Sequence, residues 1–293
     1  MLLRFLGTGT SHGVPVIACN CKVCKSHNKK NKRNRSSVYI VTDDNKHFVV
    51  DTSPEFRLQC IKYKVSHVDA VFLTHSHADH LHGIDDLRIF SSIQSPDTID
   101  ESAKNESKPP ITIYTNRKCM EHLEFRFPYL FMPVKEGGGH ANIQLFPAET
   151  SFNIGDTTIT PIPLMHGHLE TTGWLFSKWD KNHKNKESIA YLTDCNYIPQ
   201  ESFDLIKNNS GKLKHLVIDG LRIDKHSTHF SFLEAMEAAN IIGCAEQVWF
   251  THMTHKSSHN QVKKYIKEHI NQFPALKSAK SVLPAFDGLE LKI

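Results

Sequence analysis

The sequence lacks the features that mark a membrane protein. None of its 293 positions begins a run of about 18 apolar residues, the length that a membrane-spanning helix needs. The first residues, Met1–Leu6, carry a charge too early for a signal peptide and instead predict a first β-strand. We therefore expect a chain without a membrane partner.

A strong net charge is also missing. The formal net charge is only +4, which is too small to favour nucleic acid as a partner. Part of it comes from a basic stretch between Lys22 and Arg35. This stretch predicts a solvated loop, and the alternative is a rim that attracts a phosphate-bearing substrate.

The cysteines do not form a disulfide framework. There are seven, an odd number, and three of them crowd into Cys19-x-Cys21-x-x-Cys24. Such spacing favours thiolates that bind a metal in a reducing compartment, so we expect a cytoplasmic protein. The chain is rich in histidine instead, with 20 residues, and histidine is the commonest metal ligand and proton shuttle.

No internal repeat or long low-complexity tract interrupts the chain, so residues 1–293 are expected to form a single domain. Short apolar or alternating runs predict strands at Leu2–Leu6, Ser37–Val41, His47–Val50, Ala70–Leu73, Ile111–Tyr114, Thr158–Leu164, Gly173–Ser177, Ile189–Leu192, Leu216–Ile218 and Val248–Phe250. Helices are predicted at Glu55–Ile61, Ile84–Ser91, Thr115–Phe125, Phe232–Ile242 and Ser258–Phe273. This order indicates an α/β fold with two sheets and helices on their outer faces.

Polar stretches predict the surface loops. They lie at Lys25–Arg35, Ser95–Pro110 and Lys178–Ser188, the last as a long hairpin tip between two strands. Gly137–Gly139 predicts a flexible link rather than a phosphate-binding loop, because no strand-to-helix pattern surrounds it.

Imidazoles and carboxylates follow the predicted strands. A single histidine in such a place is usually a core residue with satisfied hydrogen bonds, but here the pattern recurs at His75, His166, Asp194, Asp219 and His252. In α/β folds, active sites collect at the carboxyl ends of strands. The recurrence therefore predicts a functional site at that edge.

The densest signal is His75-x-His77-x-Asp79-His80. Residues two apart in an extended segment share a face, so His75 and His77 can aim at one metal ion. A turn after them would carry Asp79 and His80 to a second ion. Two ions about 3.5–4 Å apart need several imidazoles and a shared carboxylate, which the residues at the other strand ends supply.

This motif resembles the His-x-His-x-Asp-His hallmark of the metallo-β-lactamase superfamily. Four further segments resemble the same family in order: Leu6–Thr10, Val50–Pro54, Gly83–Arg88 and Tyr191–Asp194. Together with the cysteine triplet they resemble the branch that holds the phosphoribosyl cyclic phosphodiesterase of the carbon–phosphorus lyase pathway. The resemblance covers nearly the whole chain and implies a four-layer αββα sandwich.

The resemblance also implies the metal ligands. The expected ligands are His75, His77 and His166 for the first ion, Asp79, His80 and His252 for the second, and Asp194 as a bridge between them. Zinc or manganese would occupy both positions, and a hydroxide held between the two ions would be the nucleophile. Asp51 would orient one of the ligands.

A separate structural zinc is implied for the cysteine triplet. Its ligands would be Cys19, Cys21 and Cys24 together with His255, three residues beyond His252. The four other cysteines, Cys60, Cys119, Cys195 and Cys244, lack this grouping and are expected to be packing residues.

Cleavage of a phosphodiester also needs a proton for the leaving alkoxide. The segment Asp224–Phe230 offers two histidines just before a predicted helix. The resemblance favours His229 as the general acid, and His226 is the alternative. Asp79 is counted with them among the catalytic residues.

Some side chains depart from the family pattern or extend it. His82 and His168 each follow a predicted ligand two residues later, and we take the first of each pair, His80 and His166, as the ligand. His12, Arg57 and Arg88 are weaker candidates for contact with a substrate phosphate.

The function that these residues favour is hydrolysis of small cyclic or activated phosphodiesters. The same fold also serves RNA-processing endonucleases, thioester or lactone hydrolases and non-catalytic binding proteins. The missing basic face argues against RNA, and the complete ligand set argues against a binding protein. The expected partner is a small phosphodiester, and the sequence is compatible with a homodimer.

Overall fold

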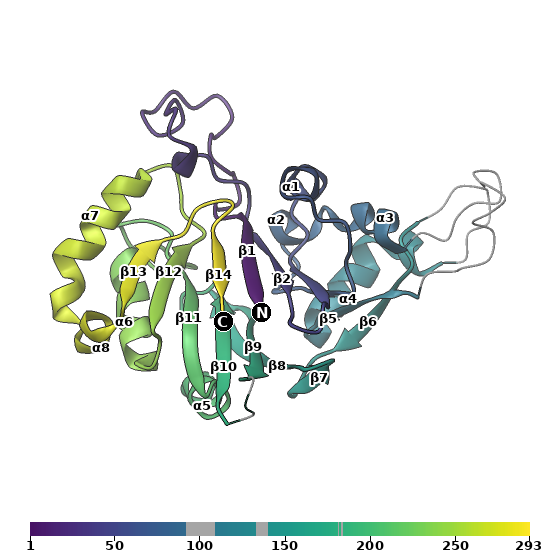
Figure 1. Ribbon diagram of the computed structural model, residues 1–293. Coiled ribbons are helices and arrows are strands. Elements are labelled where there is room, and N and C mark those ends of the chain that lie inside the picture. Colours follow the sequence, from purple (N-terminus) through teal and green to yellow (C-terminus); the bar gives the residue numbers. More distant parts are fainter. Residues whose placement is uncertain (92–108, 133–139, 181, 183) are drawn as a thin grey trace.

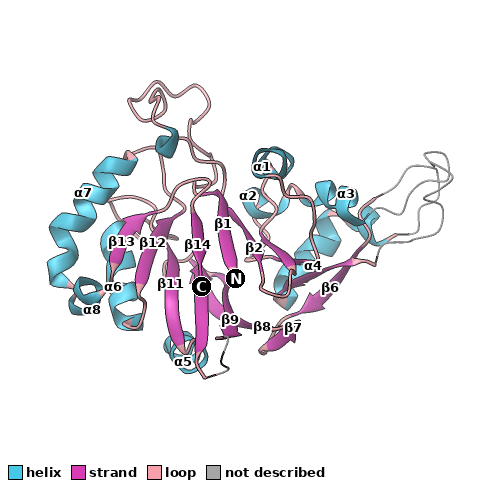
Figure 2. Cartoon of the chain, viewed as in Figure 1, coloured by secondary structure: helices cyan, strands magenta, loops and turns pink. Residues whose placement is uncertain are grey.

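The computed structural model describes residues 1–91, 109–132, 140–180, 182 and 184–293. Within these residues two seven-stranded sheets face each other, and helices flank them on both sides (Figures 1 and 2). Three large apolar clusters account for this layering: one between the sheets, and one under the helices on each side. The four-layer αββα arrangement expected from the sequence is confirmed.

The first sheet has the strand order β14-β1-β2-β3-β4-β5-β6. Its strands are β1 (Leu2–Gly7), β2 (Ser37–Val41), β3 (His47–Val50), β4 (Ala70–Phe72), β5 (Ile111–Thr115), β6 (Ile143–Pro147) and β14 (Glu290–Lys292). The pairs from β3 to β6 are parallel, whereas β14-β1, β1-β2 and β2-β3 are antiparallel. The carboxyl ends of β3, β4 and β5 therefore lie at the same edge.

The second sheet has the order β13-β12-β11-β10-β9-β8-β7. Its strands are β7 (Phe152–Ile154), β8 (Thr157–His166), β9 (Leu169–Trp179), β10 (Lys186–Leu192), β11 (Lys212–Asp219), β12 (Gln247–Thr251) and β13 (Ser281–Pro284). Strands β10 to β13 pair in parallel, and β7 to β10 pair antiparallel. As a result β8, β10, β11 and β12 all end at one edge of this sheet.

Aromatic side chains lock the two sheets together. Phe72 on β4 meets Trp174 and Phe176 on β9 edge to face, with ring centroids 5.0 and 5.2 Å apart. All three side chains are fully buried. Such pairs contribute about 0.5–1.5 kcal/mol each beyond the burial of their area. Because Phe72 is the last residue of β4, these contacts fix where the chain leaves that strand.

Helices cover both outer faces. The first sheet is covered by α1 (Phe56–Tyr63), α2 (Ala78–Leu81), α3 (Arg88–Ser91) and α4 (Arg117–Arg126), and the second by α5 (Gln200–Asn209), α6 (Phe232–Ile242), α7 (His259–His269) and α8 (Pro274–Ser278). Short 3-10 turns are η1 (Lys29–Asn31), η2 (Ile84–Leu87), η5 (Pro128–Phe131) and η6 (Ile270–Gln272).

Several predicted elements differ from the structure, among them the helix Ser258–Phe273, which is divided into α7 and η6. The predicted helix Ile84–Ser91 is divided into η2 and α3. The helix predicted from Thr115 begins at Arg117, because Asn116 caps it by accepting a hydrogen bond from the backbone N–H of Cys119. The predicted hairpin tip Lys178–Ser188 is shorter, since β9 and β10 stay paired as far as Trp179 and Lys186.

The basic stretch is not wholly solvated as predicted. Arg33 is among the most buried large side chains, and its guanidinium donates to the carbonyl oxygens of Thr254 and Ser257 at 2.5 and 3.1 Å. It thereby holds both sides of His255. Two other loop predictions, most of Ser95–Pro110 and all of Gly137–Gly139, lie outside the described residues.

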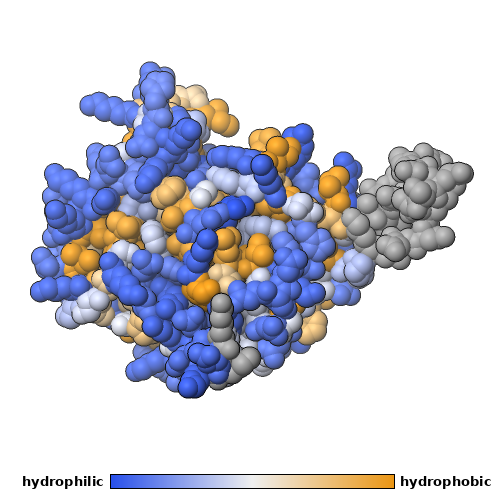
Figure 3. Space-filling model, in the orientation of Figure 1, coloured by the Kyte–Doolittle hydropathy of each residue, from blue (hydrophilic) through white to orange (hydrophobic). Residues whose placement is uncertain are grey.

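No helix among the described residues is long and apolar enough to cross a membrane. Hydrophobic side chains nevertheless gather on the surface over α1 and α3 (Figure 3). Leu58, Ile61 and Ile89 contribute to this patch, and each is exposed by more than half of its surface. The patch lies beside a cavity of about 530 Å³ between these two helices.

Two helices begin with the same reciprocal cap. Ser231 and Glu234 form it on α6, and Ser258 and Gln261 form it on α7. We predict that Ser231→Ala and Ser258→Ala each lower the free energy of unfolding by about 1 kcal/mol, because each leaves a backbone N–H without its partner. Urea denaturation measures the loss. The Ser→Thr variants keep the hydroxyl and serve as controls, and equal stability of the Ala and Thr variants would contradict the role of the caps.

Candidate active site

The residues predicted at the strand ends meet between the two sheets. His75 and His77 follow β4, Asp79 and His80 lie on α2, and His166 ends β8. Asp194 follows β10, and His252 follows β12. The parallel strands of both sheets end here, so residues that are up to 177 positions apart are brought into one place.

Two sets of side chains have their potential metal-binding atoms close together, and we call these sets the donor groups. The first donor group consists of His75, His77 and His166. One ring nitrogen of each lies within 4.8 Å of the others. His75 and His166 are buried, whereas His77 is exposed. Burial, together with the nearby His80, lowers the pKa of His75 well below its usual value. This imidazole is therefore held neutral, with a lone pair available to a cation.

A second donor group consists of Asp79, His80, Asp194 and His252, again with donor atoms within 4.8 Å of one another. His80 Nε2 lies 3.3 Å from Asp79 Oδ2, and His252 Nε2 lies 3.8 Å from the same oxygen. Burial opposes the charge of Asp194, but the imidazoles of His252 and His80 hold its pKa well below the usual value. Asp194 is thus a buried carboxylate.

Asp194 faces both groups. Its Oδ1 lies 3.9 Å from His75 Nε2, and its Oδ2 lies 3.0 Å from His80 Nε2 and 3.3 Å from His252 Nε2. A carboxylate with one oxygen toward each set of imidazoles has the geometry of a bridge between two cations.

The donor atoms fit divalent metal ions. Among the described residues, the Nε2 atoms of His75, His80 and His252 are buried and have no hydrogen-bond partner. A buried polar atom without a partner costs about 1–3 kcal/mol. Imidazole nitrogens mixed with carboxylate oxygens are the ligands that zinc and manganese accept. Cations between these atoms would satisfy all of them at once.

A second contact on the ring orients two of the imidazoles. His80 Nδ1 donates to Asp51 Oδ2 at 2.7 Å, and His166 Nδ1 donates to the carbonyl oxygen of Thr228 at 2.7 Å. Each contact places the proton on Nδ1, so the lone pair of Nε2 is available to a metal ion. Asp51 is itself fixed by the backbone N–H and the hydroxyl of Thr74.

Three of the six non-glycine residues with a positive φ among the described residues lie at the same edge. Asp51, Asp194 and His252 have φ angles of 63°, 53° and 60°, in the left-handed region that non-glycine residues rarely adopt. Each costs on the order of 1–3 kcal/mol, and such strain gathers at functional sites. The fold therefore spends stability to aim these three side chains.

His229 lies against both donor groups. Its ring centroid is 4.5 Å from that of His166 and 4.7 Å from that of His252. Its Nδ1 lies 2.8 Å from Oδ2 of the fully buried Asp219. Burial disfavours the charged ring, but the charge and the hydrogen bond of Asp219 outweigh it and raise the pKa of His229 to about 8. This shift favours the protonated ring at neutral pH.

His226 has a different environment. It is farther out, with its ring centroid 5.3 Å from that of His229. Its Nδ1 accepts a hydrogen bond from the backbone N–H of Thr228. Burial and the charge of His229 lower the pKa of His226, which makes it the poorer proton donor at neutral pH.

Two side chains of helix α4 contact Ser76, the residue between His75 and His77. His122 Nδ1 lies 2.7 Å from the hydroxyl of Ser76, and Arg126 donates to the carbonyl oxygen of the same residue. Neither of these two contacts was predicted from the sequence, and Asp219 was predicted at the strand-end edge but without a role. His122 and Arg126 are four residues apart on α4, and this spacing places them on one face of the helix. The signal for Asp219 is its position at the end of a strand.

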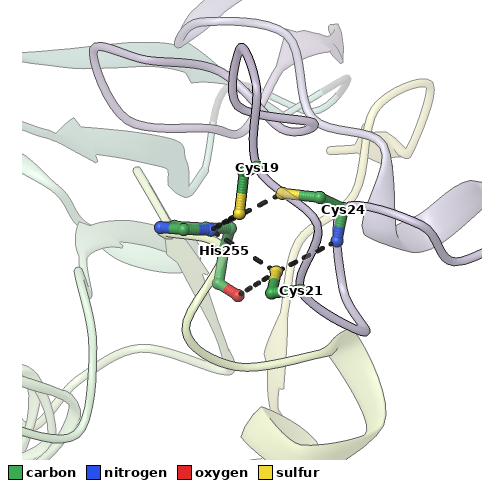
Figure 4. Close-up of side chains that lie close together, drawn as sticks. All are labelled: Cys19, Cys21, Cys24 and His255. Atoms are coloured by element: carbon green, nitrogen blue, oxygen red, sulfur yellow. Dashed lines mark hydrogen bonds between the residues drawn. The ribbon is translucent and has the colours of Figure 1, made fainter.

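A separate cysteine cluster is formed by Cys19, Cys21, Cys24 and His255 (Figure 4). The sulfurs of Cys19, Cys21 and Cys24 surround His255 Nδ1 at 3.3, 3.5 and 3.5 Å. The backbone N–H of Cys24 lowers the pKa of the Cys21 thiol to about 6, whereas burial raises that of Cys24 to about 11. Three sulfurs around one imidazole nitrogen fit a tetrahedral cation site.

Other predicted residues lie apart from these groups. In the part of the chain that the structure describes, His12, His82 and His168 are exposed and join no donor group. Arg57 and Arg88 line the cavity between α1 and α3, and no residue of either donor group lines that cavity. The described cysteines outside the cluster join no donor group either: Cys60, Cys119 and Cys195 are buried, and Cys244 is exposed.

The sequence pattern of the beta-lactamase superfamily domain matches residues 46–253. The chain belongs to the metallo-β-lactamase superfamily. It combines that fold with clusters of histidine and aspartate donors, as expected of a metal-dependent hydrolase of this superfamily. The family inferred from the sequence motifs is confirmed.

Several known proteins are similar over the full chain. A diphosphatase of the PhnP family is 29% identical, with a TM-score of 0.76 and coverage of 100% of this chain and 97% of that one. Zinc-bound PqqB of Methylobacterium extorquens is 16% identical, with a TM-score of 0.73 and complete coverage of both chains. At that identity the likeness concerns the fold alone.

A curated relative is longer than this chain. An octanoyltransferase of Porphyromonas gingivalis is 30% identical over 287 residues, which are 97% of this chain and 50% of the relative. The chain therefore spans about half of the length of that protein.

We predict that Cys21→Ser lowers the metal content by about one ion per chain and lowers the melting temperature, because the cysteine cluster loses a thiolate ligand. Plasma mass spectrometry and thermal denaturation measure the two effects. Cys244→Ser, which changes an exposed cysteine outside the cluster, should leave both unchanged. An unchanged metal content in Cys21→Ser would refute the assignment of a metal to this cluster.

Proposed function

We propose that the chain is a metal-dependent phosphodiesterase that hydrolyses small cyclic or activated phosphodiesters. The main support for the proposal is the position of Asp194, whose two oxygens face two separate sets of imidazoles. The similarity to a diphosphatase at 29% identity favours phosphate chemistry over the other reactions of this fold.

The donor groups would hold two divalent ions, zinc or manganese. His75, His77 and His166 would bind one, Asp79, His80 and His252 the other, and Asp194 both. Bound ions of this kind lower the pKa of water toward neutrality and neutralise charge on the phosphate oxygens. A structural zinc would occupy the cysteine cluster.

His229 is the proposed general acid. Asp219 bonds Nδ1 and leaves Nε2 to face the substrate. As the bond from phosphorus to the leaving oxygen breaks, Nε2 delivers its proton to that oxygen. Asp219 stabilises the charged ring before the transfer and keeps it oriented afterwards.

The proposal is tested with bis(p-nitrophenyl) phosphate and 2′,3′-cyclic nucleotides, using protein loaded with zinc or manganese. We expect hydrolysis by the wild type and loss of activity in Asp194→Ala, because this change removes the carboxylate between both donor groups. Asp204→Ala, on the exposed face of α5, should retain full activity.

Two outcomes would contradict the proposed function. If the ions are bound but neither compound is hydrolysed, phosphodiesters are not the substrates, and thioesters become the next class to test. If activity appears only with transfer-RNA precursors, the chain is an RNA-processing endonuclease.

The role of His229 is tested by changing the leaving group. We predict that His229→Ala slows hydrolysis of a 2′,3′-cyclic nucleotide by about 10²–10⁴-fold, since its alkoxide must be protonated as it leaves. Hydrolysis of bis(p-nitrophenyl) phosphate should be far less affected, because p-nitrophenolate leaves without a proton. His226→Ala is the matched control. A larger selective loss in that variant would transfer the role to His226.

A further inference from the structure

A cavity of about 670 Å³ adjoins the first donor group. It is lined by His77, Ala78, His82, Phe125, Arg126 and Phe127, and we call it the rim cavity. His77 belongs to both the cavity and the donor group. Whatever fills the rim cavity is therefore next to the reacting centre.

Phe125 presents an open aromatic face at this place. It lies in the last turn of α4 and is 86% exposed, although a phenylalanine side chain gains about 1.5–3 kcal/mol when fully buried. Its neighbour Phe127 is half-buried, with its ring edge-on to His82 at 5.7 Å and to Tyr129 at 6.3 Å. The cavity thus combines one fixed ring with one that is open to a ligand.

Arg126, which lies between Phe125 and Phe127 in the sequence, adds a positive charge to the lining of the cavity. It donates to the carbonyl oxygen of Ser76, the residue between His75 and His77, and this contact fixes the guanidinium beside the donor group. A guanidinium has five N–H donors, so others remain for an anion. A ligand that suits the cavity carries an anionic group and a flat aromatic ring in one small molecule.

We propose that the rim cavity binds the base of a small nucleotide, with the phosphodiester at the donor groups and the base stacked on Phe125. This inference rests on the proposed function and narrows its substrate class from phosphodiesters in general to those of nucleosides. Stacking on an aromatic side chain tolerates any base, because every base has a flat face.

The first test compares two cyclic phosphodiesters with the metal-loaded protein. Adenosine 2′,3′-cyclic phosphate carries a base, whereas glycerol 1,2-cyclic phosphate has the same five-membered ring without one. We expect Phe125→Ala to raise KM for the nucleotide about tenfold and to leave KM for the glycerol compound unchanged. Phe125→Trp should restore the wild-type value, and Phe131→Ala, an exposed phenylalanine outside the cavity, should have no effect.

A binding measurement separates this inference from the proposed function. Calorimetry compares adenosine 5′-monophosphate with ribose 5-phosphate, and we expect tighter binding of the nucleotide that is lost in Phe125→Ala. If the phosphodiesters are not hydrolysed but this difference holds, the base site stands and the proposed function fails. If the glycerol compound is hydrolysed while Phe125→Ala changes neither KM nor binding, the function stands and the base site is refuted.

Discussion

The structure depends on the contact between the inner faces of its two sheets. Phe72 on β4 packs against Trp174 and Phe176 on β9, and this contact sets the height of one sheet against the other. A slip of one residue along β4 would turn Phe72 away from that contact and redirect the segment that begins at His75. The apolar core and the polar edge are therefore positioned by the same few aromatic rings.

At that edge several carboxylates are buried close to one another, and burial of a carboxylate is unfavourable unless a partner stabilises its charge. Asp51, Asp194 and Asp219 are all buried, and each has an imidazole within hydrogen-bond or ion-pair distance. Asp51 and Asp219 serve the outer nitrogens of His80 and His229, whereas Asp194 faces inward. Two carboxylates thus orient rings and the third faces the imidazoles of both donor groups, so chemically similar side chains have different positions in the site.

Much of the fold was predictable because β-strands with buried faces leave a local signal. The ranges Ser37–Val41, His47–Val50 and Phe232–Ile242 were predicted with the boundaries that the structure has. Strands β6, β7, β13 and β14 and helices α2, α5 and α8 were not predicted. All of the missed strands and the helices α2 and α8 have five residues or fewer, and α5 has a mostly polar sequence after Pro199, so none offers a strong apolar period.

In the site, too, features that depend on nearby residues were predictable, and features that depend on contacts between distant segments were not. The donor residues were recognisable because they follow strands and occur in a dense motif. The burial of Arg33 was not, because its partners Thr254 and Ser257 are 221 and 224 residues away. The pairing of Ser76 with His122 and the exposure of Phe125 likewise depend on how α4 is seated.

The two ends of the chain lie side by side, at the start of β1 and the end of β14 (Figure 1). The amino nitrogen of Met1 donates to the carbonyl oxygen of Ile293 at 3.0 Å, so the backbone nearly closes into a ring. A short linker could join these ends, and new ones could be opened at the exposed tip between β9 and β10. Such a circular permutant would keep every strand of both sheets. The same architecture would then be built from elements in a different order along the chain.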